Sequence, residues 1–202
     1  MNVQKKGMLV VISGPAGVGK GTLCRALLAQ STNLDYSVSV TTRASRPGET
    51  DGKEYFFRSK EEFQKMIENG ELLEWAEFLG NFYGTPRFHV EAMLNQGKTI
   101  ILEIDIQGGK QVKNLYSEGG VFIFIVPPSF TVLSNRLRGR GTESEEVIQN
   151  RLARAHEELE NVKDYDYVVE NNDLKEAVEK LKSIIVAENC STKRVVFFSK
   201  EE

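Results

Sequence analysis

A glycine-rich segment near the N-terminus carries the most specific chemical signal in this sequence. It follows an apolar run at residues 8–13 and precedes a segment with a helical pattern. Backbone N–H groups of such a loop converge on phosphate oxygens, the helix N-terminus adds its positive dipole, and the lysine reaches the terminal phosphates. The loop therefore predicts a site for the phosphates of a nucleoside triphosphate such as ATP. The residues that we expect to bind it are Gly14, Pro15, Ala16, Gly17, Val18, Gly19, Lys20, Gly21 and Thr22.

The loop departs from the usual pattern at one position. A serine or threonine normally follows the lysine and ligates Mg²⁺ through its hydroxyl, whereas this sequence has Gly21 there and a threonine one residue later. Mg²⁺ keeps much of its hydration shell in proteins. We therefore expect Mg²⁺ as the cofactor, held mainly by ATP phosphates and water, with Thr22, Glu103 and Asp105 as candidate protein ligands.

A second group of residues has the chemistry to hold another phosphate. Arg43 and Arg46 lie three residues apart in a polar loop, and Tyr55 follows on a short apolar segment. The guanidinium group is a planar fork of donors that matches phosphate oxygens. Because exposed arginines are common, the pair taken alone is equally compatible with an ordinary surface.

Composition narrows the class of protein. The chain has 202 residues, of which 26 are Lys or Arg and 29 are Asp or Glu, so its net charge is −3, and 40% of the residues are hydrophobic. This balance favours a globular domain and disfavours a nucleic-acid-binding protein, which is normally strongly basic. No apolar run approaches the roughly 20 residues that cross a bilayer. The cysteines, Cys24 and Cys190, have no CxxC or histidine partner, so we expect two buried thiols and a cytoplasmic protein.

The hydrophobic pattern predicts the framework that positions these residues. Apolar runs at 8–13, 99–104, 121–126 and 167–169 are continuous, which is typical of strands covered on both faces. Helical segments at 20–30, 107–116, 130–138, 143–162 and 174–187 alternate with them. This alternation predicts an α/β fold, with a parallel sheet sandwiched by helices.

The pattern changes between residues 36 and 96. Short alternating segments at 36–42, 55–57, 71–78 and 81–83 predict an inserted mixed or antiparallel sheet. Two helices accompany it. Ser59 and Glu62 form a capping box before the first, and Thr85 with Pro86 opens the second, which ends near Gly97.

A charged segment in the second half predicts a lid. Thr142 and Glu145 make a further capping box there, after two glycines. We therefore expect three parts: a core of residues 1–35, 97–128 and 161–202, an acceptor-binding insertion at 36–96, and a helical lid at 129–160.

Five stretches occur in the order in which one enzyme family carries them. They are the phosphate loop, SVSVTTRASRPGETDGKEYFF (37–57), ELLEWAEFLGNFYGTP (71–86), ILEIDIQGGKQVK (101–113) and LSNRLRGRGTESEEVIQNRL (133–152). On these the chain resembles the guanylate kinases, P-loop enzymes that transfer the γ-phosphoryl group of ATP to GMP, giving ADP and GDP, in purine nucleotide metabolism. The resemblance implies a P-loop NTPase-type parallel core with an inserted GMP-binding domain and a helical lid.

The resemblance also implies roles for individual residues. The family's GMP-binding positions are matched by Ser39, Arg43, Arg46, Tyr55, Glu74, Tyr83, Thr85 and Asp105. Its lid arginines are matched by Arg136, Arg140 and Arg151, which would act in catalysis with Lys20 and Arg43. Asn171 matches the loop near the adenine of ATP. The implied partners are ATP and GMP, with no nucleic acid or membrane, and the oligomeric state stays open.

The chemistry of Glu74 makes sense of its place in this set. A carboxylate accepts hydrogen bonds from guanine N1–H and from the exocyclic amine, a donor pair that adenine does not present in the same arrangement. A site built to pair with such donors rejects an unmatched analogue strongly. Glu74 is therefore the residue that we expect to select guanine.

Other functions remain open on the residues alone. The GKGT variant of the loop also resembles adenylate kinases, so the acceptor could be AMP, which Glu74 disfavours. A non-catalytic guanylate-kinase-like module could bind a phosphorylated peptide through Arg43, Arg46 and Tyr55, which the intact Lys20 opposes. Residues 105–108 fit the DxxG string of GTPase switches, but no NKxD motif follows, so a signalling GTPase is disfavoured.

Overall fold

The computed structural model describes residues 2–78, 80–139 and 145–198. Five parallel strands form the central sheet, in the order β10-β9-β2-β8-β3. They are β2 (Met8–Ser13), β3 (Leu34–Tyr36), β8 (Thr99–Glu103), β9 (Gly120–Val126) and β10 (Tyr167–Glu170). The chain moves from β2 to one side of the sheet and later to the other. The crevice beyond the carboxyl end of β2 is thus where such folds bind ligands.

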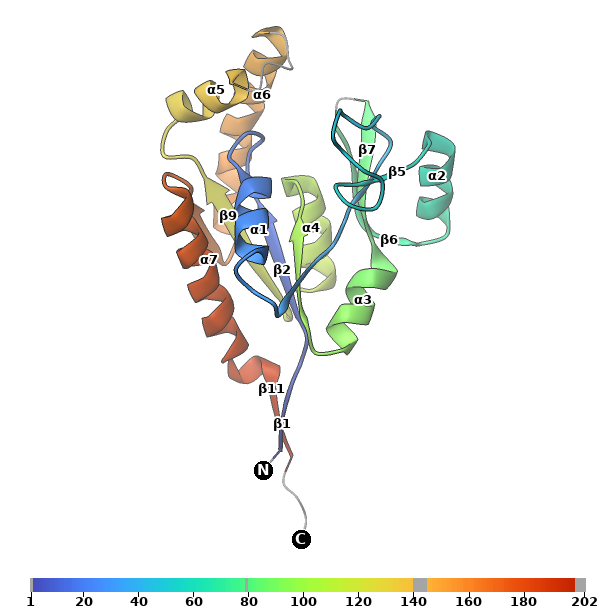
Figure 1. Ribbon diagram of the computed structural model, residues 1–202, viewed down its shortest axis with the longest axis vertical. Coiled ribbons are helices and arrows are strands. Elements are labelled where there is room, and N and C mark those ends of the chain that lie inside the picture. Colours follow the sequence, from blue (N-terminus) through green and yellow to red (C-terminus); the bar gives the residue numbers. More distant parts are fainter. Residues whose placement is uncertain (1, 79, 140–144, 199–202) are drawn as a thin grey trace.

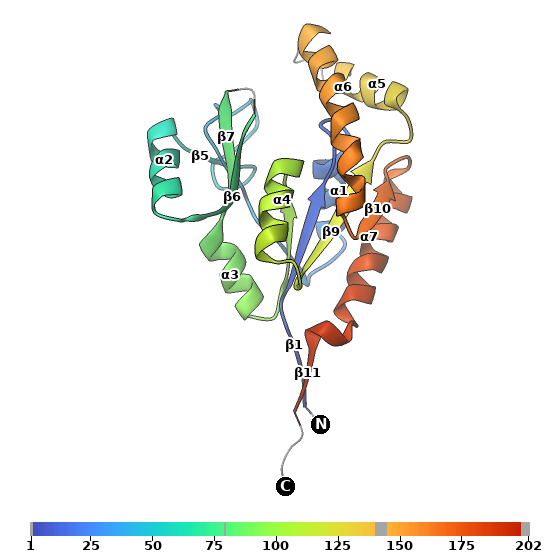
Figure 2. The ribbon, with the colours of Figure 1, turned by 180° about the vertical axis from the view of Figure 1, so that it is seen from behind.

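Helices cover both faces of this sheet (Figures 1 and 2). On one face lie α1 (Lys20–Leu28) and α7 (Leu174–Asn189), and on the other lie α4 (Ile106–Leu115) and α6 (Glu145–Leu159). The helix α3 (Arg87–Asn95) leads into β8, and α5 (Phe130–Arg138) lies with α6 beyond the carboxyl end of the sheet. Strands β2, β8 and β9 are almost fully buried between these layers, which explains their continuous apolar runs.

A second sheet stands beside the first and has the order β5-β4-β7-β6 (Figure 1). Its strands are β4 (Val40–Thr41), β5 (Phe56–Phe57), β6 (Leu72–Phe78) and β7 (Asn81–Pro86). The pairing of β4 with β5 is parallel and the other two pairings are antiparallel. The helix α2 (Lys60–Glu68) packs on this sheet through the fully buried Phe63, which stacks on Phe82. The second sheet therefore has a small core of its own.

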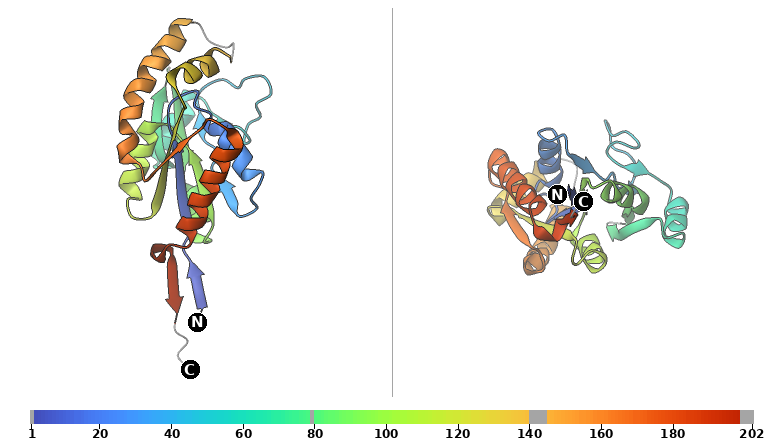
Figure 3. Two further views of the ribbon diagram at one scale, coloured as in Figure 1. Left: turned by 90° about the vertical axis from the view of Figure 1, so that its left-hand side faces the viewer. Right: turned by 90° about the horizontal axis from the view of Figure 1, so that it is seen from below.

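The two ends of the described chain pair with each other. Strands β1 (Asn2–Lys5) and β11 (Val195–Phe198) form an antiparallel ribbon that projects away from α5 and α6 (Figures 1 and 3). Two short 3₁₀ helices, Glu160–Asp164 and Thr192–Arg194, precede β10 and β11.

Most expectations about the elements are confirmed. The fold class is the predicted α/β arrangement, the helix predicted at 130–138 has those bounds, and Ser59 forms the predicted capping box. The single strand predicted over 36–42 is wrong, because the chain leaves the central sheet after Tyr36 and enters the second sheet only at Val40. Cys190 is exposed rather than buried. The capping box predicted at Thr142 lies outside the described residues.

Within the described ranges, no helix combines the length and the hydropathy that crossing a bilayer requires.

Candidate functional site

The phosphate loop joins β2 to α1 at the carboxyl end of the central sheet. Gly14, Gly17 and Gly19 adopt positive φ angles of 142°, 87° and 99°, which side chains disfavour. The ammonium group of Lys20 folds back over the loop and donates to the carbonyl oxygens of Gly14 (2.5 Å) and Pro15 (3.2 Å). Burial lowers the pKa of Lys20 below its ordinary value. Nearby carboxylates raise it, and Glu103 has the largest of these opposing effects. The loop thus presents backbone donors and one desolvated cation.

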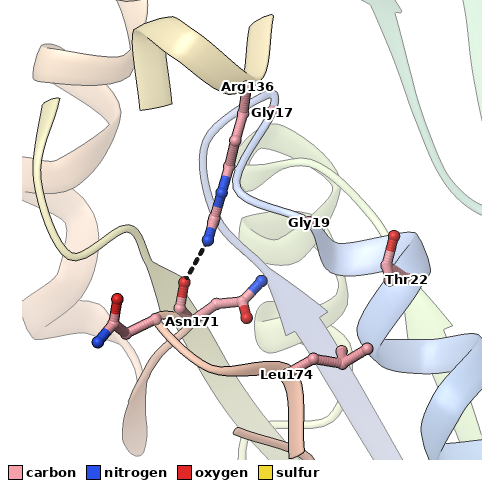
Figure 4. Close-up of a pocket in the computed structure, with 7 residues that line it drawn as sticks. Gly17, Gly19, Thr22, Arg136, Asn171 and Leu174 are labelled. Atoms are coloured by element: carbon pink, nitrogen blue, oxygen red, sulfur yellow. Dashed lines mark hydrogen bonds between the residues drawn. The ribbon is translucent and has the colours of Figure 1, made fainter. Parts of the chain in front are cut away.

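The carbonyl oxygen of Val18 is held by two other parts of the chain. It accepts from the amide of Asn171 (2.8 Å) and from Arg136 of α5 (3.2 Å), and Arg136 also donates to the backbone oxygen of Asn171 (2.8 Å). Figure 4 shows the last of these bonds. A Cβ on Gly19 would lie 2.5 Å from the Asn171 amide nitrogen. The loop conformation therefore depends on a glycine at 19 and on two distant side chains.

A pocket of about 310 Å³ opens beside this contact (Figure 4). It lies between the phosphate loop, the start of α1 and the loop that leads from β10 into α7. Its lining residues are Gly17, Gly19, Thr22, Arg136, Asn171, Asn172 and Leu174. The size and the position suit a nucleotide whose phosphates lie on the loop.

A buried carboxylate lies on β6, facing the N-terminal turn of α4. Glu74 is 5% exposed and accepts a hydrogen bond of 2.6 Å from the Thr85 hydroxyl. Its other oxygen lies only 2.2 Å from where a Cβ on Gly108 would be, so a glycine is needed there. Burial raises the pKa of Glu74 to about 7, against the lowering effect of the Thr85 hydrogen bond. Such a carboxylate gains strongly from a ligand that brings further N–H donors.

Arg43 lies in the loop after β4, surrounded by aromatic rings. Its guanidinium carbon lies 5.4 Å from the centre of the Tyr55 ring, and that ring meets the Tyr83 ring edge-on at 6.1 Å. Burial raises the pKa of Tyr55 to about 12, so its hydroxyl remains a proton donor at neutral pH. Arg43 also forms an ion pair of 2.9 Å with Glu49. The Arg46 side chain is exposed on the same loop, and Ser39 is half-buried just before β4.

Two carboxylates lie at the carboxyl end of β8, where Glu103 is the last residue of the strand and Asp105 is the N-cap of α4. Asp105 caps α4 by accepting from the Gly108 N–H (2.8 Å), and its charge acts on both Lys20 and Glu74. Glu103 accepts from the Tyr36 hydroxyl (3.1 Å). Asp105 therefore lies between the phosphate loop and the buried carboxylate of the second sheet.

The Glu103 carboxylate also lies close to the unusual residue at position 21. A Cβ on Gly21 would lie 3.2 and 3.3 Å from the two Glu103 carboxylate oxygens. The carboxylate thus points at the place where the usual loop has a serine or threonine. Within the described ranges, no group of three or more His, Cys, Asp or Glu side chains is arranged to hold a metal ion.

The structure thus brings most of the predicted residues into two facing groups. Arg151 of α6 is placed against the second sheet, with its guanidinium carbon 5.2 Å from the Phe78 ring centre, whereas Arg140 lies outside the described residues. Sequence reasoning missed three contributors: Glu49, which holds Arg43, Gly108, which makes room for Glu74, and Leu174, which lines the pocket. The Pro47–Gly48 turn signal could have directed attention to Glu49.

Comparisons with known proteins show which family the chain resembles. The guanylate kinase family model matches residues 6–188. Among curated proteins, a guanylate kinase of Desulfitobacterium hafniense (strain Y51) is 60% identical, covering 95% of both chains, and one of Halalkalibacterium halodurans is 55% identical, covering 96% of this chain and 94% of that protein. The crystal structure of guanylate kinase from Anaplasma phagocytophilum matches with a TM-score of 0.80 and 38% identity, covering 96% of this chain and 92% of that one. TT1252 from Thermus thermophilus, at 18% identity and a TM-score of 0.53, shares the fold.

Proposed function

Because this chain belongs to the guanylate kinase family and is an ATP:GMP phosphotransferase, we propose which of its residues hold each substrate and stabilise the transfer. Its substrates are ATP and GMP, and its products are ADP and GDP. The phosphate loop, residues 14–22, and Asn171 bind ATP. GMP is bound by Ser39, Arg43, Arg46, Tyr55, Glu74, Tyr83, Thr85 and Asp105.

The observation that carries this assignment is the buried carboxylate of Glu74. One of its oxygens is already satisfied by Thr85, and the other faces the start of α4. Guanine offers N1–H and an exocyclic amine on one edge. Both would donate hydrogen bonds to Glu74 in place of the water that burial has removed from it. Adenine offers an acceptor at N1 instead, which would leave a buried carboxylate against a lone pair. The cost of unpaired buried groups is the basis of selection for GMP over AMP.

Transfer between two phosphates requires charge neutralisation more than proton transfer. The acceptor phosphate has a second pKa near 6, so it is mostly dianionic at neutral pH and needs no general base. Arg43 and Arg46 offset the acceptor charge, and Lys20 offsets the charge of the donor phosphates. Arg136, Arg140 and Arg151 then stabilise the charge that spreads over the transferring group.

Guanylate kinases use a divalent metal ion with ATP, and we assign Mg²⁺ as that ion in this enzyme. The residues fit an ion held through phosphates and water, because the Glu103 carboxylate lies beside Gly21 and accepts hydrogen bonds of the kind that metal-bound water donates. We assign Thr22, Glu103 and Asp105 as the residues that accept hydrogen bonds from its waters. The ion supplies further neutralisation of the donor phosphates when it is bound.

We divide the chain into three functional parts: a core of residues 1–35, 97–128 and 161–202, a GMP-binding insertion at 36–96, and a lid at 129–160. Closure of the lid over both nucleotides would exclude water from the transferring group, so ATP hydrolysis without GMP should be slow. We also assign the enzyme to the cytoplasm, where its nucleotides are available, and cell fractionation tests that assignment.

Calorimetric titration with GMP and with guanosine tests the residue assignment. Arg43→Gln should weaken GMP binding and leave guanosine binding unchanged, because Arg43 meets only the phosphate. Glu74→Gln should weaken both. Arg58→Gln is the matched control, since Arg58 also lies over an aromatic ring and pairs with Asp51, yet outside the site. Equal GMP affinity of Arg43→Gln and the parent would refute the acceptor assignment.

A further inference from the structure

Glu49, which is not among the predicted site residues, accepts three hydrogen bonds within the loop that follows β4. Both oxygens of Glu49 accept from Nη2 of Arg43 at 2.9 Å, and one of them also accepts from the backbone N–H of Arg46 at 2.7 Å. The side chains of Arg43 and Glu49 are only 15% and 17% exposed. The two phosphate-binding arginines are thus joined through one acid.

The backbone of this loop explains why Glu49 cannot simply swing away. Residues 46–49 form a turn that is closed by the Glu49 N–H donating to the Arg46 carbonyl at 3.1 Å. Pro47 and Gly48 occupy its central positions, and Gly48 has a φ of 87°, as a type II turn requires. Glu49 therefore contacts Arg46 through both its backbone and its side chain, and its position is set by the turn.

The other contacts of Arg43 show which of its N–H donors are not used by Glu49. Nη1 donates to the Ala44 carbonyl at 2.6 Å, and the guanidinium group lies against the rings of Tyr55 and Phe57. In the part of the chain that the structure describes, the hydrogen bonds of Arg43 engage Nη1 and Nη2, so its Nε–H and a second N–H of Nη1 face elsewhere. A guanidinium group held at Nη2 and against two rings keeps these donors in one orientation.

From this geometry we propose that Glu49 is a positioning residue for the acceptor phosphate, which holds Arg43 and the Arg46 backbone in the arrangement that receives GMP. This inference rests on the proposed role of Arg43. Glu49 does not touch the substrate; it removes conformational freedom that Arg43 would otherwise lose on binding. A carboxylate that only took the place of the phosphate would contact Arg43 alone and would be displaced when GMP binds. Glu49 instead also accepts a hydrogen bond from the Arg46 backbone and belongs to the turn.

The electrostatic surroundings agree with a persistent ion pair. Partial burial alone would raise the pKa of Glu49, but hydrogen bonds from the Arg46 backbone and from Arg43 lower it below its ordinary value. Glu49 is therefore ionised in the neutral range and carries the charge that holds Arg43 there.

Two possible roles of Glu49 predict opposite changes in GMP affinity for one substitution. Glu49→Gln keeps an oxygen that can accept from the Arg46 N–H but loses the charge that holds Arg43. If Glu49 positions Arg43, GMP binding weakens by about tenfold, the size expected for one charge-assisted contact. If Glu49 competes with the phosphate, GMP binding becomes tighter.

The experiment compares four variants of the full chain with the parent. Glu54→Gln is the control, because Glu54 accepts from the Thr50 N–H in the same loop without contacting Arg43. We expect Glu49→Gln to raise the KM for GMP about tenfold while kcat, the KM for ATP, the affinity for guanosine and the melting temperature stay at parent values. Glu54→Gln should match the parent. In an Arg43→Gln background, Glu49→Gln should add little.

Several results would overturn the proposal. They are unchanged or tighter GMP binding by Glu49→Gln, an equal loss of GMP and guanosine binding, or a full additional loss in the Arg43→Gln background. If only the Glu49→Gln result contradicts our expectation, the assignment of Arg43 to the acceptor phosphate still stands. Parent-like GMP binding by Arg43→Gln would instead refute that assignment together with this inference.

Discussion

Protonation of Glu74 should weaken guanine binding as the pH falls. Because burial raises the pKa of Glu74 to about 7, about half of the free enzyme carries a neutral carboxyl at neutral pH. Guanine donors bind the ionised form, so the apparent affinity falls once the pH drops below 7. Between pH 8 and pH 6, a single group with this pKa weakens binding by about tenfold.

Guanosine is the ligand for this measurement, because it has no phosphate that titrates in the same range. Calorimetry at pH 8 and pH 6 gives the affinities, and titrations in two buffers of different ionisation enthalpy at pH 7 give the proton release, expected to be about half a proton per guanosine. Glu74→Gln removes the titrating group, so its weaker affinity should be the same at both pH values. Equal affinities of the parent at pH 6 and pH 8, or tighter binding at pH 6, would refute this reasoning.

The same substitution should change stability in the opposite direction from binding. A rise of the pKa from 4.5 to about 7 on folding favours the neutral carboxyl. The corresponding stability is present below pH 4.5 and is lost as the pH rises through 7, by up to about 3 kcal/mol. Glu74→Gln is permanently neutral and keeps an acceptor for Thr85. We therefore expect it to stabilise the free protein at pH 8 by a few kcal/mol at most and to have little effect near pH 4, as measured by urea unfolding.

Three further substitutions test separate parts of the site. Gly108→Ala should displace the Glu74 carboxylate and abolish most GMP binding, whereas Gly119→Ala, which meets no atom within 4 Å, should bind GMP normally in calorimetry. Asn171→Ala removes one hydrogen bond to the phosphate loop and should cost about 1 kcal/mol of stability together with a higher KM for ATP, which urea unfolding and steady-state kinetics would show. Phe63→Ala empties the core of the second sheet and should cost about 3–5 kcal/mol, with GMP binding lost before ATP binding as urea is added.

Local signals predicted the strand, the loop and the helix that position Lys20. The phosphate loop needs only a strand, a few glycines, a lysine and a helix in succession, and these are neighbours in the sequence. The helix at 130–138 and the capping box of Ser59 are also local, because hydrogen bonds between residues three or four apart determine them. The two helix features depend little on the rest of the fold, whereas the conformation of the phosphate loop also depends on Arg136 and Asn171.

Features that depend on distant partners were less accessible. The strand predicted over 36–42 is split because residues 37–39 cross between two sheets, and nothing in their alternation marks that change. Gly108 needs to be glycine because of Glu74, which lies 34 residues earlier in the sequence. The contact between Glu49 and Arg43 depends on a particular turn and a particular rotamer. Cys190 is exposed because it follows the last turn of α7, although a cysteine is more often buried.

The contacts of the Val18 carbonyl have a consequence for the order in which the enzyme matures. Both of its side-chain partners come from the last third of the chain, Arg136 from α5 and Asn171 from the turn before α7. A nascent polypeptide that has emerged from the ribosome only as far as α4 already contains all residues of the phosphate loop. It still lacks the two side chains that hydrogen-bond to the Val18 carbonyl. Competence to retain ATP should consequently arise late in translation, once β10 has added to the sheet.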